Sequence, residues 1–287
     1  MSMSNKLLKI ENLELSFKMY EGVSNVLKKI NLNLNKGEKV ALVGESGSGK
    51  SVTTKLILGL LNQKNVFKNG KIFFNNKNII NLSQNEYKKI RGNNISIIFQ
   101  DPIAALNPVF KIKDQFHEVN LNYKKFSRQD SFLRACEALK KVSISDPERV
   151  LESYPFQLSG GLAQRVVITM AMINKPELLL ADEPSTALDV TIQNQALDLM
   201  DDLTKETNTA VLLITHNMGV VRKFAEKVYV IYKGVIVEEG TKEQIFKNPG
   251  HPYTKALLEA IPKLSGDGLP KHDDNTPDYV SIPKYVH

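Results

Sequence analysis

Apolar and polar residues alternate in two stretches near the N-terminus, from Leu8 to Phe17 with one slip in phase and from Ile30 to Leu34. A period of two residues is typical of strands with one buried face, so both stretches are predicted to be strands of an antiparallel sheet. The run from Lys39 to Val43 is largely apolar, and a glycine-rich turn and a helix-forming segment to about Leu60 follow it. This order predicts a strand, a loop and a helix.

The rest of the chain is predicted to contain further strands and helices. Residues 71–82 have the pattern of a short hairpin and 95–99 that of a buried strand, whereas 109–149 show helical periodicity without strand signals. Alternation of strand and helix then resumes in the segments 178–181, 191–206, 210–215 and 228–232. It predicts a parallel sheet covered by helices, with the helical region as an insertion. After Asn248, repeated prolines leave one short helix near Tyr253 to Ala260.

The composition is that of an ordinary globular protein. Of 287 residues, 42% are hydrophobic and 24% are charged, and the formal net charge is +7. The lysine pairs are dispersed along the chain, which favours a solvated surface over a nucleic-acid site. No apolar run is long enough to cross a bilayer or to form a signal peptide, so we expect any membrane association to be peripheral. The single cysteine, Cys136, excludes an internal disulfide and a multi-cysteine metal site built by this chain alone, which fits a reducing cytoplasm.

One segment matches the phosphate-binding loop pattern in full and stands between the predicted strand and helix: Gly44-Glu45-Ser46-Gly47-Ser48-Gly49-Lys50-Ser51. Its small residues let backbone N–H groups turn inward around phosphates, and the helix N-terminus adds a positive dipole. Lys50 is expected to reach the β- and γ-phosphates and the Ser51 hydroxyl to bind Mg²⁺. The alternative, an ordinary Gly/Ser turn, explains neither the full pattern nor its context.

Two further strand ends carry polar residues. The predicted strand Leu178 to Ala181 ends in Asp182 and Glu183, and alternation along a strand directs consecutive side chains to opposite faces. Asp182 is therefore expected to hold Mg²⁺ through water, and Glu183 to polarise the attacking water. His216, after the next strand, is expected to contact the γ-phosphate. Each signal alone also suits a structural residue, but ligands bind at the carboxyl ends of parallel strands, where all three meet.

The segment Leu158-Ser159-Gly160-Gly161-Leu162-Ala163-Gln164-Arg165 precedes a helical stretch, which Ser159 is able to cap. With this segment the chain resembles the ATP-binding-cassette (ABC) ATPases, whose signature motif has this form. The other matches, in family order, are Gln100 as the Q-loop, Ser185 to Asp189 as the D-loop and His216 as the switch histidine. The resemblance also implies an adenine-stacking aromatic, Phe17, with Tyr20 as the competing candidate. It covers roughly residues 7–262.

A finer resemblance points to the oligopeptide and dipeptide permease branch. It rests on Gln100-Asp101-Pro102, Leu106-Asn107-Pro108, the run from Ala181 to Val190, and Gly250-His251-Pro252-Tyr253-Thr254. Many members carry cysteines for an iron–sulfur cluster in the C-terminal extension, whereas this tail has none, so we expect no cluster. The branch also contains nickel and metallophore importers, which stay as an alternative to peptide import. We expect the cassette to span residues 1–247, with a helical subdomain at about 101–165, and the extension to span 248–287.

The resemblance implies an α/β fold with a phosphate-loop (RecA-like) core, an antiparallel β subdomain and an inserted helical subdomain. It further implies ATP and Mg²⁺ as ligands, Val52 among the nucleotide contacts, and Gln100 as a link between Mg²⁺, attacking water and the membrane subunits. Ser159, Gly160, Gly161 and Asp189 are expected to complete a nucleotide site across a pair of ATPase subunits, the partner being a different chain. The other implied partners are two transmembrane permease subunits and an extracytoplasmic solute-binding protein, with no nucleic acid.

Two other classes share part of this pattern. A chromosome-maintenance ATPase usually adds a long coiled coil, zinc cysteines or a second cassette, and a phosphate-loop kinase or GTPase does not explain Leu158 to Arg165. An exporter commonly fuses cassette and membrane domains in one chain. The sequence therefore favours an ATP-hydrolysing transport subunit, a translocase, that lies peripherally on the cytoplasmic face of the cell membrane.

Overall fold

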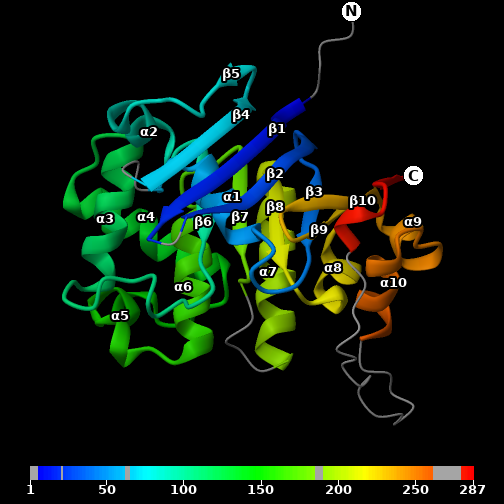
Figure 1. The fold of residues 1–287 in the computed structure, drawn as a ribbon. Coiled ribbons are helices and arrows are strands. Elements are labelled where there is room, and N and C mark those ends of the chain that lie inside the picture. Colours follow the sequence, from blue (N-terminus) through cyan, green and yellow to red (C-terminus); the bar gives the residue numbers. More distant parts are fainter. Residues whose placement is uncertain (1–5, 21, 62–64, 185–189, 261–278) are drawn as a thin grey trace, which may run out of the picture. The chain divides into compact units, whose positions relative to one another are not determined.

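The structure is a computed structural model that describes residues 6–20, 22–61, 65–184, 190–260 and 279–287 (Figure 1). Backbone contacts divide the chain into two compact units. The first consists of residues 1–82 together with 212–287, and the second of residues 83–211. The first unit is therefore discontinuous in sequence, and its two segments flank the second.

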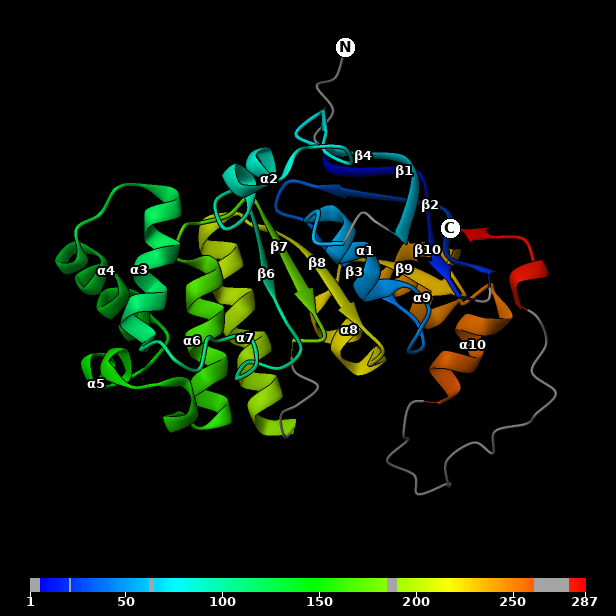
Figure 2. The same ribbon diagram turned by 60° about the vertical axis from the view of Figure 1, so that its left-hand side comes forward.

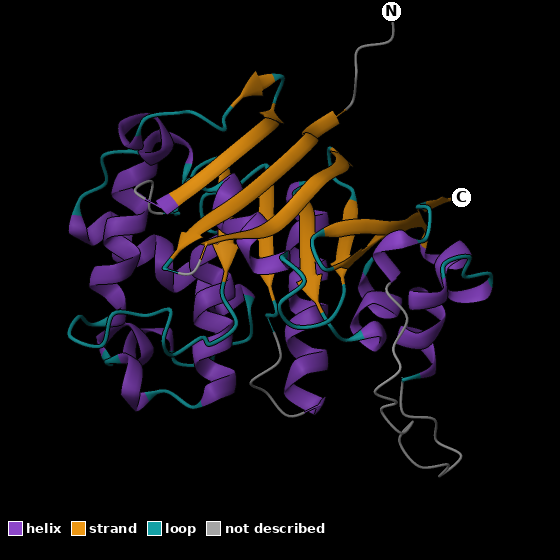
Figure 3. Ribbon diagram, viewed as in Figure 1, coloured by secondary structure: helices purple, strands orange, loops and turns teal. Residues whose placement is uncertain are grey.

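The first unit contains a four-stranded antiparallel sheet in the order β2-β1-β4-β5. Its strands are β1 (Lys6–Met19), β2 (Gly22–Asn35), β4 (Val66–Phe74) and β5 (Lys77–Asn78). The three long strands run side by side in Figure 3. The apolar residues of the alternation, from Leu8 to Leu15 and from Ile30 to Leu34, are buried. The antiparallel sheet predicted from that alternation is therefore confirmed.

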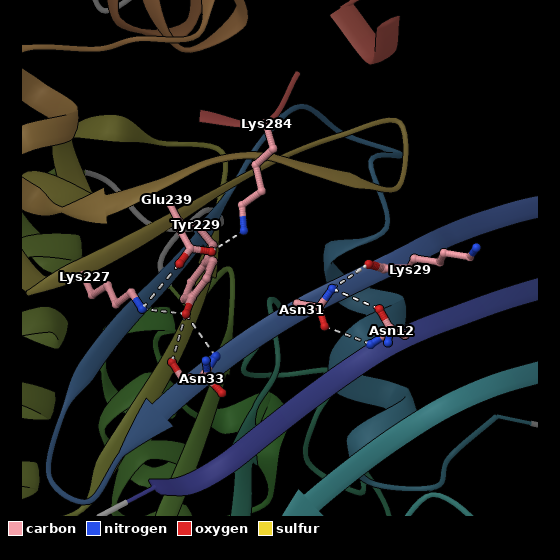
Figure 4. Close-up of polar contacts among 8 residues, drawn as sticks. All are labelled: Asn12, Lys29, Asn31, Asn33, Lys227, Tyr229, Glu239 and Lys284. Atoms are coloured by element: carbon pink, nitrogen blue, oxygen red, sulfur yellow. Dashed lines mark hydrogen bonds and ion pairs between the residues drawn. The ribbon is translucent and has the colours of Figure 1, made fainter. Parts of the chain in front are cut away.

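The slip in phase within β1 is a β-bulge. The register between β1 and β2 shifts between Ile10 and Leu13, and Asn12 there has a left-handed φ of 46°. The backbone N–H of Asn12 donates to Oδ1 of Asn31 at 3.0 Å, and Nδ2 of Asn31 donates to the carbonyl of Lys29 at 3.0 Å (Figure 4). Asparagine tolerates left-handed backbone well, so the bulge returns Leu13 to the buried face at little cost.

The first unit also contains the strands β11-β10-β9-β3-β8, in that order. They are β3 (Lys39–Val43), β8 (Ala210–Thr215, in this unit from residue 212), β9 (Lys227–Tyr232), β10 (Val235–Thr241) and β11 (Tyr285–Val286). The pairs β3–β9 and β10–β11 are parallel, and β9–β10 is antiparallel. The buried Tyr229 ties β9 to β2, because its hydroxyl accepts from the Asn33 N–H at 3.0 Å and from Lys227 Nζ at 2.7 Å (Figure 4).

The helices of the first unit are α1 (Lys50–Ile57), α8 (Met218–Phe224), α9 (Lys242–Lys247), α10 (Pro252–Glu259) and the 3₁₀ helix η3 (Tyr279–Ser281). Helices α8 and α9, the start of α10 and Tyr279 of η3 contribute to one core cluster with β3, β9 and β10. The strand, loop and helix order expected around residues 39–60 is confirmed by β3 and α1. The short helix expected near Tyr253 is α10.

The second unit combines a parallel pair of strands, β6 (Ile95–Ile98) and β7 (Leu178–Asp182), with helices. These are α2 (Gln84–Ile90), α3 (Ile112–Tyr123), α4 (Arg128–Lys141), α5 (Pro147–Glu152), α6 (Gly160–Met172), α7 (Val190–Thr207) and the 3₁₀ helix η2 (Pro155–Gln157). Helices α3, α4 and α5 contact one another and form a group in Figure 2. They confirm the helical stretch expected at 109–149. Each helix in the described parts of the chain is too short or too polar to span a membrane.

Candidate functional site

The phosphate-binding pattern forms the loop between β3 and α1 in the first unit. Two of its glycines are required by close contacts, and one of them, Gly49, by its backbone conformation as well. A Cβ on Gly44 would lie 2.0 Å from the carbonyl oxygen of Ile231, and one on Gly49 would lie 2.6 Å from Cδ2 of Leu27. Gly49 also has a φ of +105°, a conformation that residues other than glycine rarely adopt. The loop is therefore pressed against β9 on one side and β2 on the other.

The polar groups of the loop are arranged to receive an anion. Lys50 is buried at 4% exposure, and its Nζ donates to the carbonyl oxygens of Gly44 and Glu45, at 2.7 Å each. The Ser48 carbonyl accepts from the Gly234 N–H at 3.0 Å, while the buried Ser48 Oγ has no hydrogen-bond partner among the described residues. A buried hydroxyl without a partner is rare, and a phosphate oxygen would satisfy it. Helix α1 adds its positive end, since its N-cap Gly49 has no capping side chain.

In the second unit, three of the predicted metal and catalytic residues follow the ends of the paired strands β6 and β7. Ile98 at the end of β6 is in register with Ala181 of β7. Asp182, the last residue of β7, is 7% exposed. Glu183 follows it and is half-buried, and Gln100 lies two residues beyond β6 and is exposed. The structure thus brings Gln100, Asp182 and Glu183 to the carboxyl ends of neighbouring parallel strands.

The backbone at Glu183 differs from the strand geometry expected from the sequence. Its φ is +50°, a left-handed conformation that costs a residue with a side chain about 1–3 kcal/mol. The two acids are therefore separated by a sharp turn after Asp182 rather than by strand alternation. Gln164 of α6, 1% exposed, donates through Nε2 to the carbonyl of Pro184 at 2.7 Å and fixes this turn. Sequence analysis gave Gln164 no role of its own, since its partner is 20 residues away.

The signature segment forms the start of α6. Ser159 is the N-cap, and its Oγ accepts from the Leu162 N–H at 3.4 Å. Ser159 and Gly160 are exposed, whereas Gly161 is half-buried, and a Cβ on it would come within 3.3 Å of Ile192. The helix end therefore presents a hydroxyl and glycine backbone at the surface of the second unit.

The remaining predicted residues belong to other elements of the first unit or lie outside the described chain. In the first unit, His216 is exposed directly after β8, the neighbour of β3, and Asn217 caps α8 through Oδ1 on the Gly219 N–H at 2.8 Å. Phe17 is half-buried in β1, while Tyr20 is fully exposed after it. Adenine stacking by Phe17 stays a prediction, with Tyr20 the more accessible candidate. Asp189 and the rest of 185–189 lie outside the described residues.

Comparison with known families decides between the classes that share a phosphate loop. A family model described as "ABC transporter" matches residues 27–186. The chain belongs to the ABC transporter family. A second model, "Oligopeptide/dipeptide transporter, C-terminal region", matches residues 237–284. Membership in the ABC family and in its peptide-transporter branch, expected from the signature segment and from Gly250 to Thr254, is thereby confirmed.

Relatives within the ABC family match almost the whole chain. The oligopeptide transport ATP-binding protein OppD of Bacillus subtilis (strain 168) is 45% identical over 283 residues, which is 97% of this chain and 79% of OppD. The dipeptide transport ATP-binding protein DppD of the same organism is 46% identical over 281 residues, 97% of this chain and 84% of DppD. The expected enzyme class, an ABC transport ATPase, is confirmed.

Solved structures agree with the expected fold. A dimeric post-hydrolysis state of the ATP-binding cassette MJ0796, bound to ADP and Pi, gives a TM-score of 0.72 at 32% identity and covers 82% of this chain and 98% of that chain. A second dimeric structure of MJ0796, described as a bacterial ABC transporter cassette, also gives a TM-score of 0.72, at 31% identity and the same coverage. The phosphate-loop α/β fold of the ABC ATPases is confirmed.

Proposed function

We propose that this chain is the ATP-hydrolysing subunit of a complex that imports short peptides. The observation that carries the proposal is the match of residues 237–284 to the C-terminal region of oligopeptide and dipeptide transporters, in a chain with a complete phosphate loop. OppD and DppD are named for oligopeptide and dipeptide transport, so a nickel or metallophore importer is not favoured.

Each residue of the proposed ATPase site is assigned one task. The backbone of residues 44–49, with Ser51 and Val52 in the first turn of α1, binds the phosphates, and Lys50 adds a positive charge. Glu183 polarises the attacking water, and His216 contacts the γ-phosphate. Gln100 orients the same water. Catalysis rests on positioning and on stabilising charge, with little covalent chemistry by the protein.

A divalent cation fits the chemistry of the proposed site. Ser51, Gln100 and Asp182 offer hydroxyl, amide and carboxylate oxygens, which are the donors that Mg²⁺ prefers. Asp182 is 7% exposed and ends β7, and this strand pairs with β6, which ends two residues before Gln100. The side chains of Ser51, Gln100 and Asp182 would hold the Mg²⁺, which would supply positive charge against the phosphates.

The site is proposed to be completed by a second ATPase subunit. Ser159 and Gly160 are exposed at the start of α6, where a hydroxyl and backbone N–H groups are available to a nucleotide held by a partner. Asp189, in the family's D-loop, is assigned to the same contact. The dimeric MJ0796 structures support pairing of cassettes, and the partner is expected to be a different chain in the same importer.

Mixing two defective variants tests this composite site. Ser159→Arg blocks the surface offered to the partner's nucleotide, and Lys50→Ala disables the chain's own phosphate loop, so each variant alone is expected to be inactive. If two copies pair, a mixture regains part of the ATPase rate, because mixed dimers keep one complete site. If the natural partner is a different chain, activity requires that chain and the mixture alone stays inactive. A monomer, confirmed by light scattering with ATP, that hydrolyses at the full complex rate would refute the sandwich.

Uptake experiments test the transported solute and the proposed partners. A strain that lacks this gene is expected to lose uptake of labelled di- and tripeptides while nickel uptake stays normal. The parental gene restores peptide uptake and the Lys50→Ala gene does not. Affinity purification from membranes is expected to recover two transmembrane subunits, a second ATPase and a solute-binding protein, with this chain on the cytoplasmic face. Loss of nickel uptake with normal peptide uptake would instead assign the nickel importer.

A further inference from the structure

The segment Gly250 to Thr254 reaches the phosphate loop through one side chain. Tyr253, at the start of α10, is 1% exposed, and its hydroxyl accepts a hydrogen bond from the backbone N–H of Glu45 at 3.0 Å. The two residues are 208 positions apart and both belong to the first unit. The catalytic assignments above leave Tyr253 without a role.

The peptide that Tyr253 contacts is the one that also holds the phosphate-binding lysine. The N–H of Glu45 and the carbonyl of Gly44 belong to one peptide group, and that carbonyl accepts from Lys50 Nζ at 2.7 Å. A peptide whose N–H is engaged is a better acceptor at its oxygen, because successive hydrogen bonds polarise one another. The Tyr253 hydroxyl, the peptide and the Lys50 ammonium therefore form one continuous chain.

Aromatic packing fixes the position of the Tyr253 ring. Its centroid lies 4.4 Å from that of Tyr232 and 5.5 Å from that of Tyr279, and the rings are tilted rather than stacked. Such contacts between aromatic rings stabilise the position of a ring beyond the contribution of its buried surface area. Tyr232 follows Ile231 on β9, the residue whose carbonyl touches Gly44. The same strand thus supports both ends of the contact. Burial raises the pKa of Tyr253 and keeps its hydroxyl neutral.

A buried carboxylate anchors the segment from the opposite side. Glu238 of β10 is 0% exposed, and it accepts from the N–H of Gly250 at 2.7 Å and of His251 at 3.1 Å. Its Oε1 also lies 2.9 Å from Nε2 of His287, beside β11. Nδ1 of His251 in turn accepts from the Tyr253 N–H at 3.2 Å. The backbone just before Tyr253 is therefore held by several hydrogen bonds.

We propose that Tyr253 is a positioning residue of the ATPase site, which fixes the Gly44–Glu45 peptide and through it the ammonium of Lys50. The segment Gly250 to Thr254 thereby couples the C-terminal region of the chain to nucleotide turnover. This inference rests on the assignment of Lys50 as the phosphate-binding lysine. It gives a mechanical role to a motif that served above only as a mark of the peptide-transporter branch.

The test is Tyr253→Phe, which keeps the ring and removes the acceptor oxygen. Loss of one hydrogen bond that orients Lys50 is expected to lower kcat for ATP about three- to tenfold. KM for ATP is expected to change less than kcat, because Lys50 acts most on the charge that develops in the transition state. Tyr279→Phe is the matched control, since it removes a hydroxyl from the same aromatic cluster and leaves the Glu45 contact in place. Its kcat is expected to be parental. Both are measured in the assembled importer.

A second measurement needs no ATP, and its first part needs only the unmodified chain. In the unmodified chain the Glu45 amide is expected to exchange with deuterium more slowly than the amides of the exposed Ser46 and Gly47, and in Tyr253→Phe it is expected to exchange faster. A Glu45 amide that exchanges as fast as its exposed neighbours in the unmodified chain would overturn the inference, as would parental kcat in Tyr253→Phe. An unmodified complex that does not hydrolyse ATP would instead count against the proposed ATPase role, because the exchange result does not depend on it.

Discussion

Lys50→Ala is expected to abolish ATP hydrolysis and to weaken ATP binding at least tenfold. Charge-assisted hydrogen bonds contribute about 1.5–3 kcal/mol each, so the loss of an ammonium proposed to contact two phosphates corresponds to a factor of about ten or more. The lysine is buried and aimed along the loop, where its Nζ lies 2.7 Å from two loop carbonyls, so its charge stays in the loop.

The control for this variant is Lys55→Ala, which removes an exposed lysine from the last turn of the same helix. It changes the net charge by the same amount and leaves the loop intact, so its ATP affinity and turnover are expected to be parental. Binding is measured by titration calorimetry and turnover by phosphate release. Parental ATP affinity and turnover in Lys50→Ala would show that the phosphate loop is not the nucleotide site.

Glu183→Gln is expected to retain ATP binding and to stall hydrolysis. The amide preserves the size of the side chain and the left-handed turn after Asp182, but it does not act as a carboxylate base. General-base catalysis contributes about 10²–10⁴-fold in rate, so kcat is expected to fall at least about a hundredfold. ATP-bound dimers are expected to accumulate, because in the proposed pair of ATPase subunits closure needs nucleotide and reopening needs hydrolysis.

Size-exclusion chromatography with ATP measures the trapped dimer, in the presence of the natural partner chain if that chain is required. Glu206→Gln is a suitable control, since Glu206 lies on α7 of the same unit and forms an exposed ion pair with Lys141. That variant is expected to hydrolyse ATP normally and to show no trapped dimer. Parental turnover in Glu183→Gln would show that another residue polarises the water.

Local patterns in the sequence predicted those elements of the fold whose structure depends mainly on residues close together in the chain. The alternation of β1 and the order of strand, loop and helix around the phosphate-loop pattern both depend on a few neighbouring residues, and both were confirmed. Even the slip in the alternation was visible, but its cause was not, since the bulge at Asn12 is held by Asn31 on another strand. Helix α2 was missed although Ser83 and Glu86 form a capping box, a signal that the sequence did contain.

The candidate site was predictable in its residues and less so in its geometry. The adjacent acids Asp182 and Glu183 indicated a strand end, but the positive φ of Glu183 depends on tertiary contacts such as the one from Gln164 to Pro184. The contact from Tyr253 to Glu45 joins residues 208 positions apart, and no local pattern predicts it. The roles assigned to all the candidate site residues stay predictions, those of Lys50, Asp182 and Glu183 as well as those of Phe17, Gln100 and His216.

The hydrogen bond from Gln164 to Pro184 determines how many nucleotide sites a substitution affects in the proposed pair of ATPase subunits. A chain that loses Lys50 spoils the site built on its own loop, and the partner's site still receives an intact signature helix. A chain that loses Gln164 loses the hydrogen bond between the turn at Pro184, next to Glu183, and α6, the helix that it is proposed to offer to its partner. In terms of mutational robustness, a substitution of Lys50 is expected to impair one of the two nucleotide sites of the proposed pair. A substitution of Gln164 is expected to impair both.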